Sequence, residues 1–259
     1  PGVVSHISSM VEDKKTSAAD IGDVISKDQV LSAKILRLVN SPVYGFPGRI
    51  SSVTHALVLL GFNVVKGLVL STAVFDTFSR HAHGLWEHSL GCALLSRRLG
   101  RELGMNDVEE IMVAGLLHDL GKVVLSYMLP SDYEAALEMA RDKRCHIAVA
   151  EREIFTVDHA RVASWLADHW HLPSRLSDSL TYHHRPERAK KSPDVTAVVL
   201  VADILARGMG YGNPGDRTMP PLSTEAYQGL SLTFDQIDKV LEEVEMEFAS
   251  GADLFETQD

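Results

Sequence analysis

A histidine and an aspartate stand next to each other inside a long apolar stretch of this sequence. His118 and Asp119 lie within Ala114–Lys122, and aliphatic residues flank this segment on both sides. An ionised carboxylate is tolerated in an apolar interior only when it is paired, hydrogen-bonded or bound to a metal. The stretch therefore predicts a buried helix whose polar pair meets a cation. A buried, hydrogen-bonded pair without an ion is the alternative.

Any further ligands of such a cation must come from other parts of the chain, because adjacent residues of a helix point about 100° apart. Candidate donors with apolar neighbours recur on the predicted helices. With the central pair they are His88, His118, Asp119, His159, His183, His184 and Asp203. Nitrogen and oxygen ligands without thiolate suit Mn, Fe, Zn or Ni, and a carboxylate such as Asp119 can bridge two ions. Seven donors exceed the needs of one tetrahedral centre, so we predict a site for two divalent ions.

Each donor also has an ordinary structural explanation. The alternatives are a carbonyl cap for His88, an exposed helix face for Asp203, capping of a helix start for His159, and a solvated helix end for His183 and His184. Asp158, beside His159, is a helix cap in this interpretation and not a ligand. Cys92 lies one turn after His88 and could reach a metal, but core packing is the simpler explanation. The remaining histidines are treated as ordinary core or surface residues: His6, His55, His81, His83, His146, His169 and His171.

Helix signals recur throughout the sequence, whereas the alternation typical of strands is nearly absent. Capping patterns mark helix starts at Ser17, Asp28, Ser131 and Asp158, and the central pair lies in one helix from Asn106 to about Tyr127. The other expected helices cover residues 52–60, 62–78, 85–103, 131–143, 158–170, 173–184, 194–207 and 234–248. A hydrophobic content of 45% supports a proper core. We therefore predict an all-α protein.

Composition argues against several classes of function. The net charge of -10 disfavours direct binding to the phosphate backbone of nucleic acid. Two cysteines, Cys92 and Cys145, argue against a disulfide scaffold and against a cysteine-based zinc site. We find neither an apolar run of the length needed to cross a bilayer nor a signal peptide. The expectation is a soluble, cytoplasmic protein without a membrane partner.

Four short segments follow one another in the first part of the chain: Asp20–Ile25, Leu36–Gly45, Ile50–Val53 and Ala56–Gly61. In order and spacing they resemble the HDOD family, bacterial signalling modules whose name means HD-related output domain. The resemblance covers the chain from about Ser8 to Asp203. It implies an N-terminal helical bundle over residues 1–80 packed against an HD-type metal-binding core over residues 81–210. A C-terminal loop and helix, residues 211–259, would pack on that core.

The resemblance also implies how the donors divide between two ions. Carried over from the HD superfamily, and from its HD-GYP branch in particular, the pattern gives His88, His118 and Asp203 to one ion, His159, His183 and His184 to the other, and Asp119 to both. In HD phosphodiesterases the lysine that corresponds to Lys122 helps to hold phosphate, and a cation there suits an anionic, phosphorylated ligand. Asp119 and Lys122 are accordingly the predicted catalytic residues. A surface lysine that completes a helix end is the alternative for Lys122.

One segment departs from the active branch of that superfamily. The residues after His184, Arg185–Lys191, lack the Gly-Tyr-Pro signature that marks cyclic-di-GMP hydrolases, and Gly210–Pro214 lies too far along the chain to replace it. Many HDOD members are thought to be non-catalytic and to act by contacting partners. Many of those, however, lack ligands that this chain keeps.

Taken together, these features predict a bacterial signal-transduction output module with a dinuclear metal site, for which Fe or Mn is favoured and Zn or Ni are the other candidates. Its expected partners are signalling proteins and a phosphorylated small molecule. The second candidate is an active metal-dependent phosphohydrolase acting on a nucleotide or cyclic nucleotide. A di-iron oxygenase shares the ligands, but nothing in the sequence favours it.

Overall fold

The computed structural model describes residues 10, 16–41, 44, 46, 49–78 and 84–251, and His6, His81 and His83 lie outside these ranges. The regular structure of this part of the chain is helical and contains no strand, which confirms the all-α prediction. Two compact units divide the chain. The first consists of residues 1–73 and 243–259, and the second of residues 74–242.

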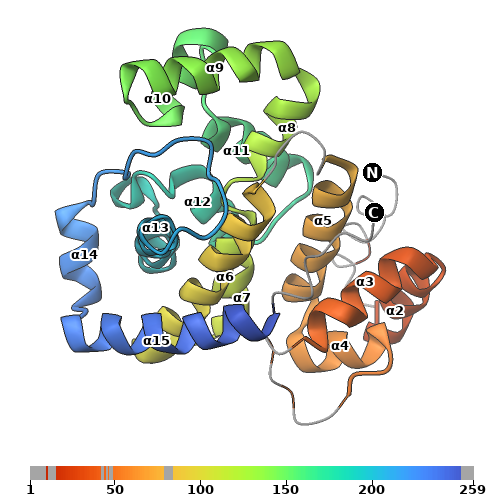
Figure 1. The fold of residues 1–259 in the computed structure, drawn as a ribbon. Coiled ribbons are helices and arrows are strands. Elements are labelled where there is room, and N and C mark those ends of the chain that lie inside the picture. The colour runs from red at the N-terminus through yellow and green to blue at the C-terminus, as the bar shows by residue number, and fades with distance from the viewer. Residues whose placement is uncertain are drawn as a thin grey trace. The chain divides into compact units, whose positions relative to one another are not determined.

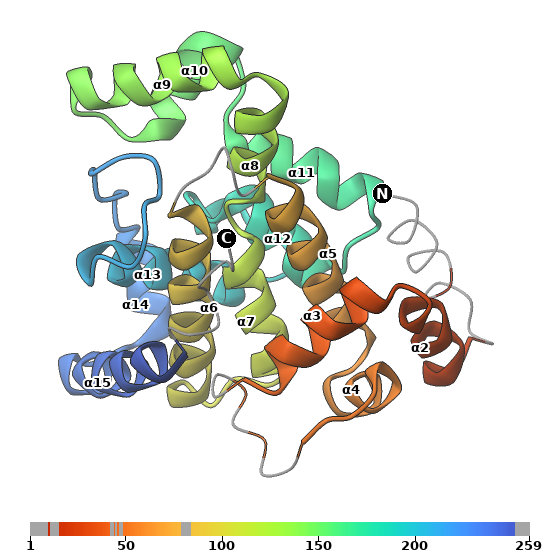
Figure 2. The ribbon, with the colours of Figure 1, turned by 45° about the vertical axis from the view of Figure 1, so that its right-hand side comes forward.

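The first unit contains three short helices, each of which begins at a side-chain cap: α2 (Ala18–Ser26), α3 (Gln29–Val39) and α4 (Val53–Leu60). Figure 2 shows these helices. The unit also includes the first part of α5 (Phe62–Phe78) and the last part of α15 (Phe234–Gly251). Ser17 and Asp20 form the predicted capping box, and the side chain of Asp28 accepts a hydrogen bond from the N–H of Leu31. Such caps satisfy amide groups that a helix end leaves without partners. Helices α2, α3 and α4 pack on one another.

Asn40 fixes the chain where α3 ends. Its Nδ2 donates to the carbonyl oxygens of Leu36 and Ile50 at 2.8 and 2.7 Å, and its Oδ1 accepts from the N–H of Ile50 at 2.7 Å. The side chain thereby closes the segment between α3 and α4 into a loop with paired ends. The amide suits this position because its NH₂ group can donate two hydrogen bonds while its oxygen accepts a third.

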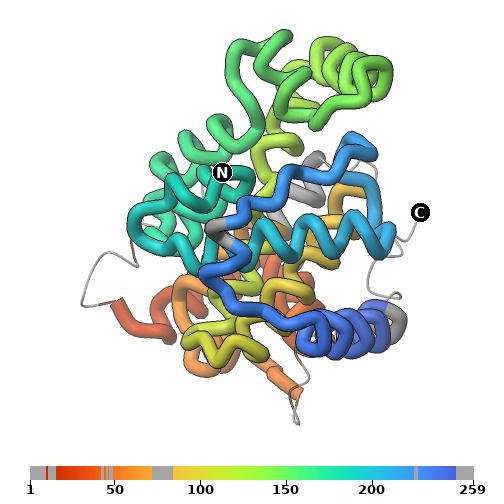
Figure 3. Tube along the Cα trace, turned by 90° about the vertical axis from the view of Figure 1, so that its left-hand side faces the viewer, coloured from red at the N-terminus to blue at the C-terminus, as the bar shows by residue number. Residues whose placement is uncertain are grey.

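The second unit carries the predicted ligands and is built mainly from α6 to α13. The bounds are α6 (Leu85–Glu102), α7 (Val108–Leu117), α8 (Leu120–Met128), α9 (Pro130–Lys143), α10 (Ile147–Phe155), α11 (His159–His169), α12 (Ser174–Tyr182), the short η2 (Pro186–Arg188) and α13 (Pro193–Gly208). After a loop follow α14 (Thr224–Leu230) and α15 (Phe234–Gly251). Helices α6, α7 and α13 pack against one another, and α11 packs on α8 and α12 (Figure 1). Helices α9 and α10 form a pair at one end of this unit (Figure 3).

The helix expected from Asn106 to Tyr127 is interrupted in the structure. Helix α7 ends at Leu117 and α8 begins at Leu120, because Asp119 has the non-helical backbone angles φ -95 and ψ 13. The prediction of one continuous helix is therefore wrong at the central pair. The interruption frees the directions of both side chains from the fixed spacing of a regular helix.

Three other local expectations also differ from the structure. Ser131 is not a helix cap, since α9 begins at Pro130 and Pro favours the first helical position. Helices α10 and α14 were not predicted. The stretch Val108–Met128 is long and apolar enough to cross a membrane by length and composition, contrary to the expectation that no such run exists. In the structure 83% of its most apolar window is buried, as in a core helix.

Candidate metal centre

The seven predicted ligands converge from five separate places in the second unit. His88 lies on α6, His118 and Asp119 at the junction of α7 and α8, His159 at the start of α11, His183 and His184 directly after α12, and Asp203 on α13. All are at most 1% exposed except His184, which is half-buried. Two groups have ligand atoms within 4.8 Å of one another: His88, Cys92, His118 and Asp203, and His159, His183 and His184.

Asp119 lies between the two groups, with one carboxylate oxygen directed at each. Its Oδ2 is 3.3 Å from Nε2 of His118 and 3.8 Å from Nε2 of His88. Its Oδ1 is 3.3 Å from Nε2 of His159 and 3.8 Å from Nε2 of His183. A carboxylate in this position can serve two neighbouring ions, one through each oxygen.

Three of the imidazoles are held by their other ring nitrogen. Nδ1 of His118 is 2.7 Å from the carbonyl oxygen of Gly115, and Nδ1 of His183 is 3.1 Å from that of Leu180. Nδ1 of His159 is 2.6 Å from a carboxylate oxygen of Glu151. Each acceptor fixes the proton on Nδ1, so the lone pair of Nε2 faces the centre. Protein metal sites commonly orient their histidines in this way.

The geometry fits a cation better than a network of hydrogen bonds. With both Nδ1 atoms acting as donors, the Nε2 atoms of His159 and His183 are acceptors, yet they lie 3.3 Å apart. Several buried atoms of the cluster have no hydrogen-bond partner among the described residues: Nε2 of His118, Oδ1 of Asp119, Oδ2 of Asp203, and Nδ1 of His88 and His184. Buried polar atoms without a partner cost free energy unless an ion or water satisfies them.

The protein environment keeps both aspartates ionised. Burial disfavours their charged forms, but the charges of His118 and Lys122 hold the pKa of Asp119 well below its usual range. For Asp203 the charge of Arg207 and the hydrogen bond to His88 overcome the burial and also lower the pKa strongly. Ligands must be deprotonated to bind a metal, so both carboxylates are in the form that metal binding needs.

The pKa values of the imidazoles do not all shift in the same direction. Burial lowers the pKa of His88, and burial together with neighbouring imidazoles holds the pKa values of His183 and His184 well below the usual range. The pKa of His118 is raised, because the nearby charges of Asp119 and Asp203 outweigh the effect of burial. Neutral imidazole is the ligand form of histidine, and three members of the cluster are held in that form.

Two buried cations compensate the carboxylates. Lys122 is fully buried, and its Nζ donates to Oδ2 of Asp119 at 2.6 Å and to the carbonyl oxygen of Pro214 at 2.9 Å. Nε of Arg207 donates to Oδ1 of Asp203 at 2.8 Å. Lys122 is therefore not the surface lysine of the alternative interpretation. Its ammonium group is directed at Asp119.

Glycines allow the elements of the centre to approach closely. A Cβ atom on Gly115 would lie 2.5 Å from Oγ of Ser96 and 2.7 Å from the carbonyl oxygen of Cys92, so α7 can lie against α6 only without a side chain there. This approach brings the rings of His88 and His118 to a centroid distance of 5.5 Å. Gly121 has the same role between α8 and the first residue of α11.

Cys92 and Asp158 have the positions that the sequence favoured. Sγ of Cys92 is 3.5 Å from Nε2 of His88, but burial and the charges of Asp203 and Asp119 raise the pKa of its thiol well above the usual range. A neutral, packed thiol fits these surroundings. Asp158 is the N-cap of α11, where its side chain accepts from the N–H of Arg161.

Three residues near the centre were missed or passed over from sequence. Glu151 lies on the unpredicted helix α10, is fully buried, and accepts from both the ring and the backbone N–H of His159. Arg207 follows Asp203 by one turn, a spacing that does indicate an ion pair. His146, treated as ordinary, lies with its ring 4.6 Å from that of His184.

Replacing Glu151 by Gln should weaken metal binding by about 10- to 100-fold, since outer carboxylates of this kind raise the basicity of the histidine that they hold. Glutamine keeps the size of the side chain, so the fold should be retained. Competition with a chelator of known affinity measures the loss. The matched control is Glu153→Gln, an exposed residue of the same helix that pairs with Lys143 at the surface. Equal metal affinity in the two variants would contradict this role of Glu151.

A comparison with protein families identifies the family of this chain, because the family model of the HDOD domain matches residues 1–186. The chain belongs to the HDOD family. An HDOD domain protein of unknown function from Geobacter sulfurreducens has a similar structure, with 25% identity, a TM-score of 0.77, and coverage of 99% of this chain and 93% of that one. The similarity thus extends beyond the matched HDOD residues over nearly the whole chain.

More distant structures show the same fold. A candidate phosphohydrolase from Shewanella amazonensis is 20% identical, with a TM-score of 0.70 and coverage of 98% and 93% of the two chains. A candidate signal transduction protein from Marinobacter aquaeolei is 19% identical, with a TM-score of 0.75 and coverage of 98% and 58%.

A relative found by sequence is an uncharacterized protein of Treponema pallidum, which is 24% identical over 219 residues, or 83% of this chain. This HDOD chain spans 43% of the length of that relative.

Proposed function

We propose that this HDOD chain is a bacterial signal-transduction output module whose helical core holds two divalent metal ions. The observation that carries the proposal is the position of Asp119, whose two oxygens face two separate groups of imidazoles. His88, His118 and Asp203 would hold one ion, and His159, His183 and His184 the other, with Asp119 shared between them. Signalling proteins are the proposed partners.

The donor set favours Fe or Mn in this site, with Zn or Ni as the other candidates. Its members are imidazole nitrogens and carboxylate oxygens, which suit these metals, whereas the nearby thiol of Cys92 has the environment of a neutral core residue. Asp119 and Asp203 are ionised, and Lys122 and Arg207 balance part of their charge.

A metal-dependent phosphohydrolase is the second candidate. The complete ligand set favours it, as does a basic pocket beside His184. Two divalent ions would supply Lewis-acid stabilisation of the charge that develops during phosphoester hydrolysis. In either function Lys122 acts on Asp119, because its ammonium group holds this carboxylate ionised and in place.

Metal analysis combined with a turnover assay separates the two candidates. Purified protein is analysed for bound metal and is tested with bis(p-nitrophenyl) phosphate and with cyclic dinucleotides in the presence of Mn(II) or Fe(II). The output module predicts bound metal without turnover. Metal-dependent turnover that is abolished in both His118→Ala and Asp119→Ala would establish the enzyme instead. A folded wild-type protein that binds no divalent metal would contradict both.

A further inference from the structure

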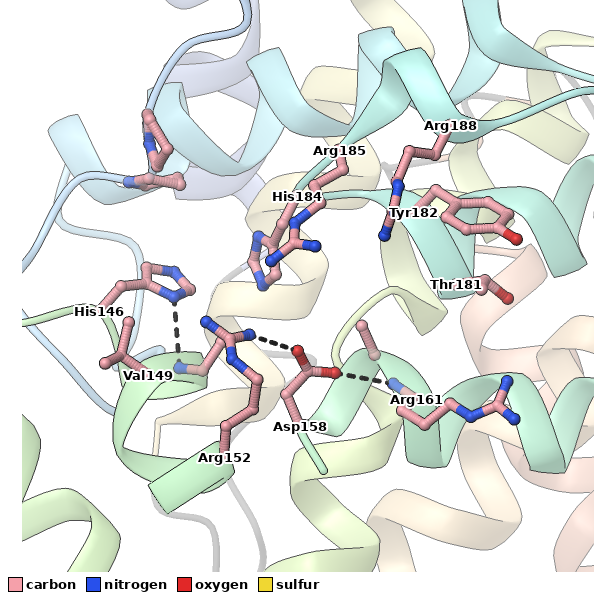
Figure 4. A pocket seen from close by; sticks show the side chains of 14 residues that line it. His146, Val149, Arg152, Asp158, Arg161, Thr181, Tyr182, His184, Arg185 and Arg188 are labelled. Carbon is pink, nitrogen blue, oxygen red and sulfur yellow. Dashed lines mark hydrogen bonds and ion pairs between the residues drawn. The ribbon is translucent and has the colours of Figure 1, made fainter. Parts of the chain in front are cut away.

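A cavity of about 430 Å³ opens beside the second group of histidines (Figure 4). Its walls come from α10, from the start of α11, from the segment between α12 and η2, and from Pro220 and Pro221. The volume lies within the range of small-molecule sites, which is about 300–1,000 Å³. His146 and His184 line the side that faces the histidine cluster.

The cavity is basic in a chain whose net charge is -10. Four arginines line it, Arg152, Arg161, Arg185 and Arg188, together with a single carboxylate, that of Asp158. Guanidinium groups bind phosphate through paired, charge-assisted hydrogen bonds and remain charged at every physiological pH. A local excess of positive charge favours an anionic ligand even when the whole protein is acidic.

The four arginines differ in how free their guanidinium groups are to bind a ligand. Arg152 donates to Asp158 at 2.5 Å, so its charge is partly neutralised. Arg161 is directed along its own helix, with its guanidinium 3.4 Å from Oγ of Ser164 and 5.5 Å from the ring centre of Trp165.

Arg185 and Arg188 are exposed and, unlike Arg152, neither guanidinium forms an ion pair with a described residue. Figure 4 shows the side chains of both descending into the cavity from the same side as His184. These two guanidinium groups are therefore the ones free to bind a ligand.

The cavity adjoins the histidine cluster through one residue. His184 lines the cavity, and its Nε2 lies 2.9 Å from Nε2 of His159. The lining also includes Ala148, Val149 and Pro221, which offer apolar surface to an uncharged group. A ligand that fills the space would present its anionic end to the arginines and His184, and its organic part to these apolar side chains.

We propose that this cavity binds a small organic phosphate, with the phosphoryl groups held by Arg185 and Arg188 and one of them facing His184. The charge of the two free guanidinium groups matches a ligand with at least two negative charges, such as a compound carrying a diphosphate. The position of the phosphoryl group next to the cluster rests on the proposed function. The arginine site itself does not need the metal.

Inorganic pyrophosphate is the probe, and calorimetric titration of chelator-treated protein at low ionic strength is the measurement. Arg185→Gln and Arg188→Gln should each weaken binding by about tenfold or more, because each removes charge-assisted hydrogen bonds. Arg141→Gln is the matched control, since Arg141 is an exposed arginine of α9 outside the cavity. It should bind within about twofold of wild type. Circular dichroism confirms that the variants are folded.

Wild-type protein that fails to bind pyrophosphate, or arginine variants that bind it as well as wild type, would overturn the inference. Bound metal is measured separately on each untreated variant and should not change in Arg185→Gln or Arg188→Gln. In His118→Ala, the metal content should fall by about one ion, because His118 belongs to one group only, while pyrophosphate binding persists. Metal bound without pyrophosphate binding refutes the arginine site alone. Pyrophosphate binding that follows the arginines, in a protein whose untreated wild-type form binds no divalent metal, refutes the metal centre alone.

Discussion

Asp119→Ala should weaken the binding of both metal ions by about a hundredfold or more, since even an outer-shell partner of a ligand is worth 10- to 100-fold. His159→Ala should weaken mainly one ion, because His159 belongs to one group only. Elemental analysis after dialysis against a chelator measures the difference. Asp168→Ala, which removes an exposed carboxylate from α11, is the control and should keep the wild-type metal content.

Asp119→Ala also leaves the ammonium group of Lys122 buried without its carboxylate partner. Breaking a buried ion pair in this way costs about 3–5 kcal/mol, so poor folding alone could lower the metal content. A double variant, Asp119→Asn with Lys122→Met, removes both charges and should fold better than Asp119→Ala. It should still fail to hold the ions. A folded double variant with the full metal content would contradict the bridging position of Asp119.

Gly121→Ala should destabilise the fold by about 3 kcal/mol or more, at or beyond the upper end of overpacking effects. A Cβ atom at this position would overlap the carbonyl oxygen of His159 and lie 2.7 Å from its carbonyl carbon. Both atoms belong to the backbone, so α8 and the start of α11 must separate. Because Asp119 and His159 lie on these two elements, bound metal should fall as well.

Chemical denaturation of Gly121→Ala and of Gly229→Ala gives the comparison. A Cβ atom on Gly229, in α14, would meet nothing within 4 Å, and alanine favours a helix over glycine by about 1 kcal/mol. That control should be as stable as wild type or slightly more stable. Equal stability of the two variants would show that α8 and α11 do not approach as closely as described.

Helix starts could be predicted where the signal is local. The side chains of Asp28, Ser52 and Asp158 each accept from an amide three residues ahead, so the sequence around each residue contains the whole interaction. The same holds for Thr233, which exchanges hydrogen bonds with Gln236 at the start of α15. Helix α10 was not predicted from the sequence. Its buried residues include two alanines and the charged Glu151, so the sequence does not mark a large apolar face there.

The candidate site could be predicted only in part. An ionisable pair in an apolar run marked His118 and Asp119, and a family resemblance supplied the division of the other donors, whose metal role stays a proposal. The interruption between α7 and α8 was not predicted, because the apolar residues on both sides of Asp119 continue without a helix-breaking residue at the pair. Glu151 was missed because only the tertiary fold brings it to His159.

The basic cavity could not be predicted from any single segment. Arg152 comes from α10, whereas Arg185 and Arg188 come from the chain after α12. Each arginine alone is typical of a solvated surface, and the overall charge of -10 argues in the opposite direction. Their common function follows only once the fold places them around one space.

Anomalous diffraction from crystals grown with Mn(II) or Fe(II) tests the metal centre most directly. Two peaks are expected, one beside each oxygen of Asp119, the first among His88, His118 and Asp203 and the second among His159, His183 and His184. A single peak, or metal found only outside these side chains in protein that carries metal by elemental analysis, would contradict the two-ion centre.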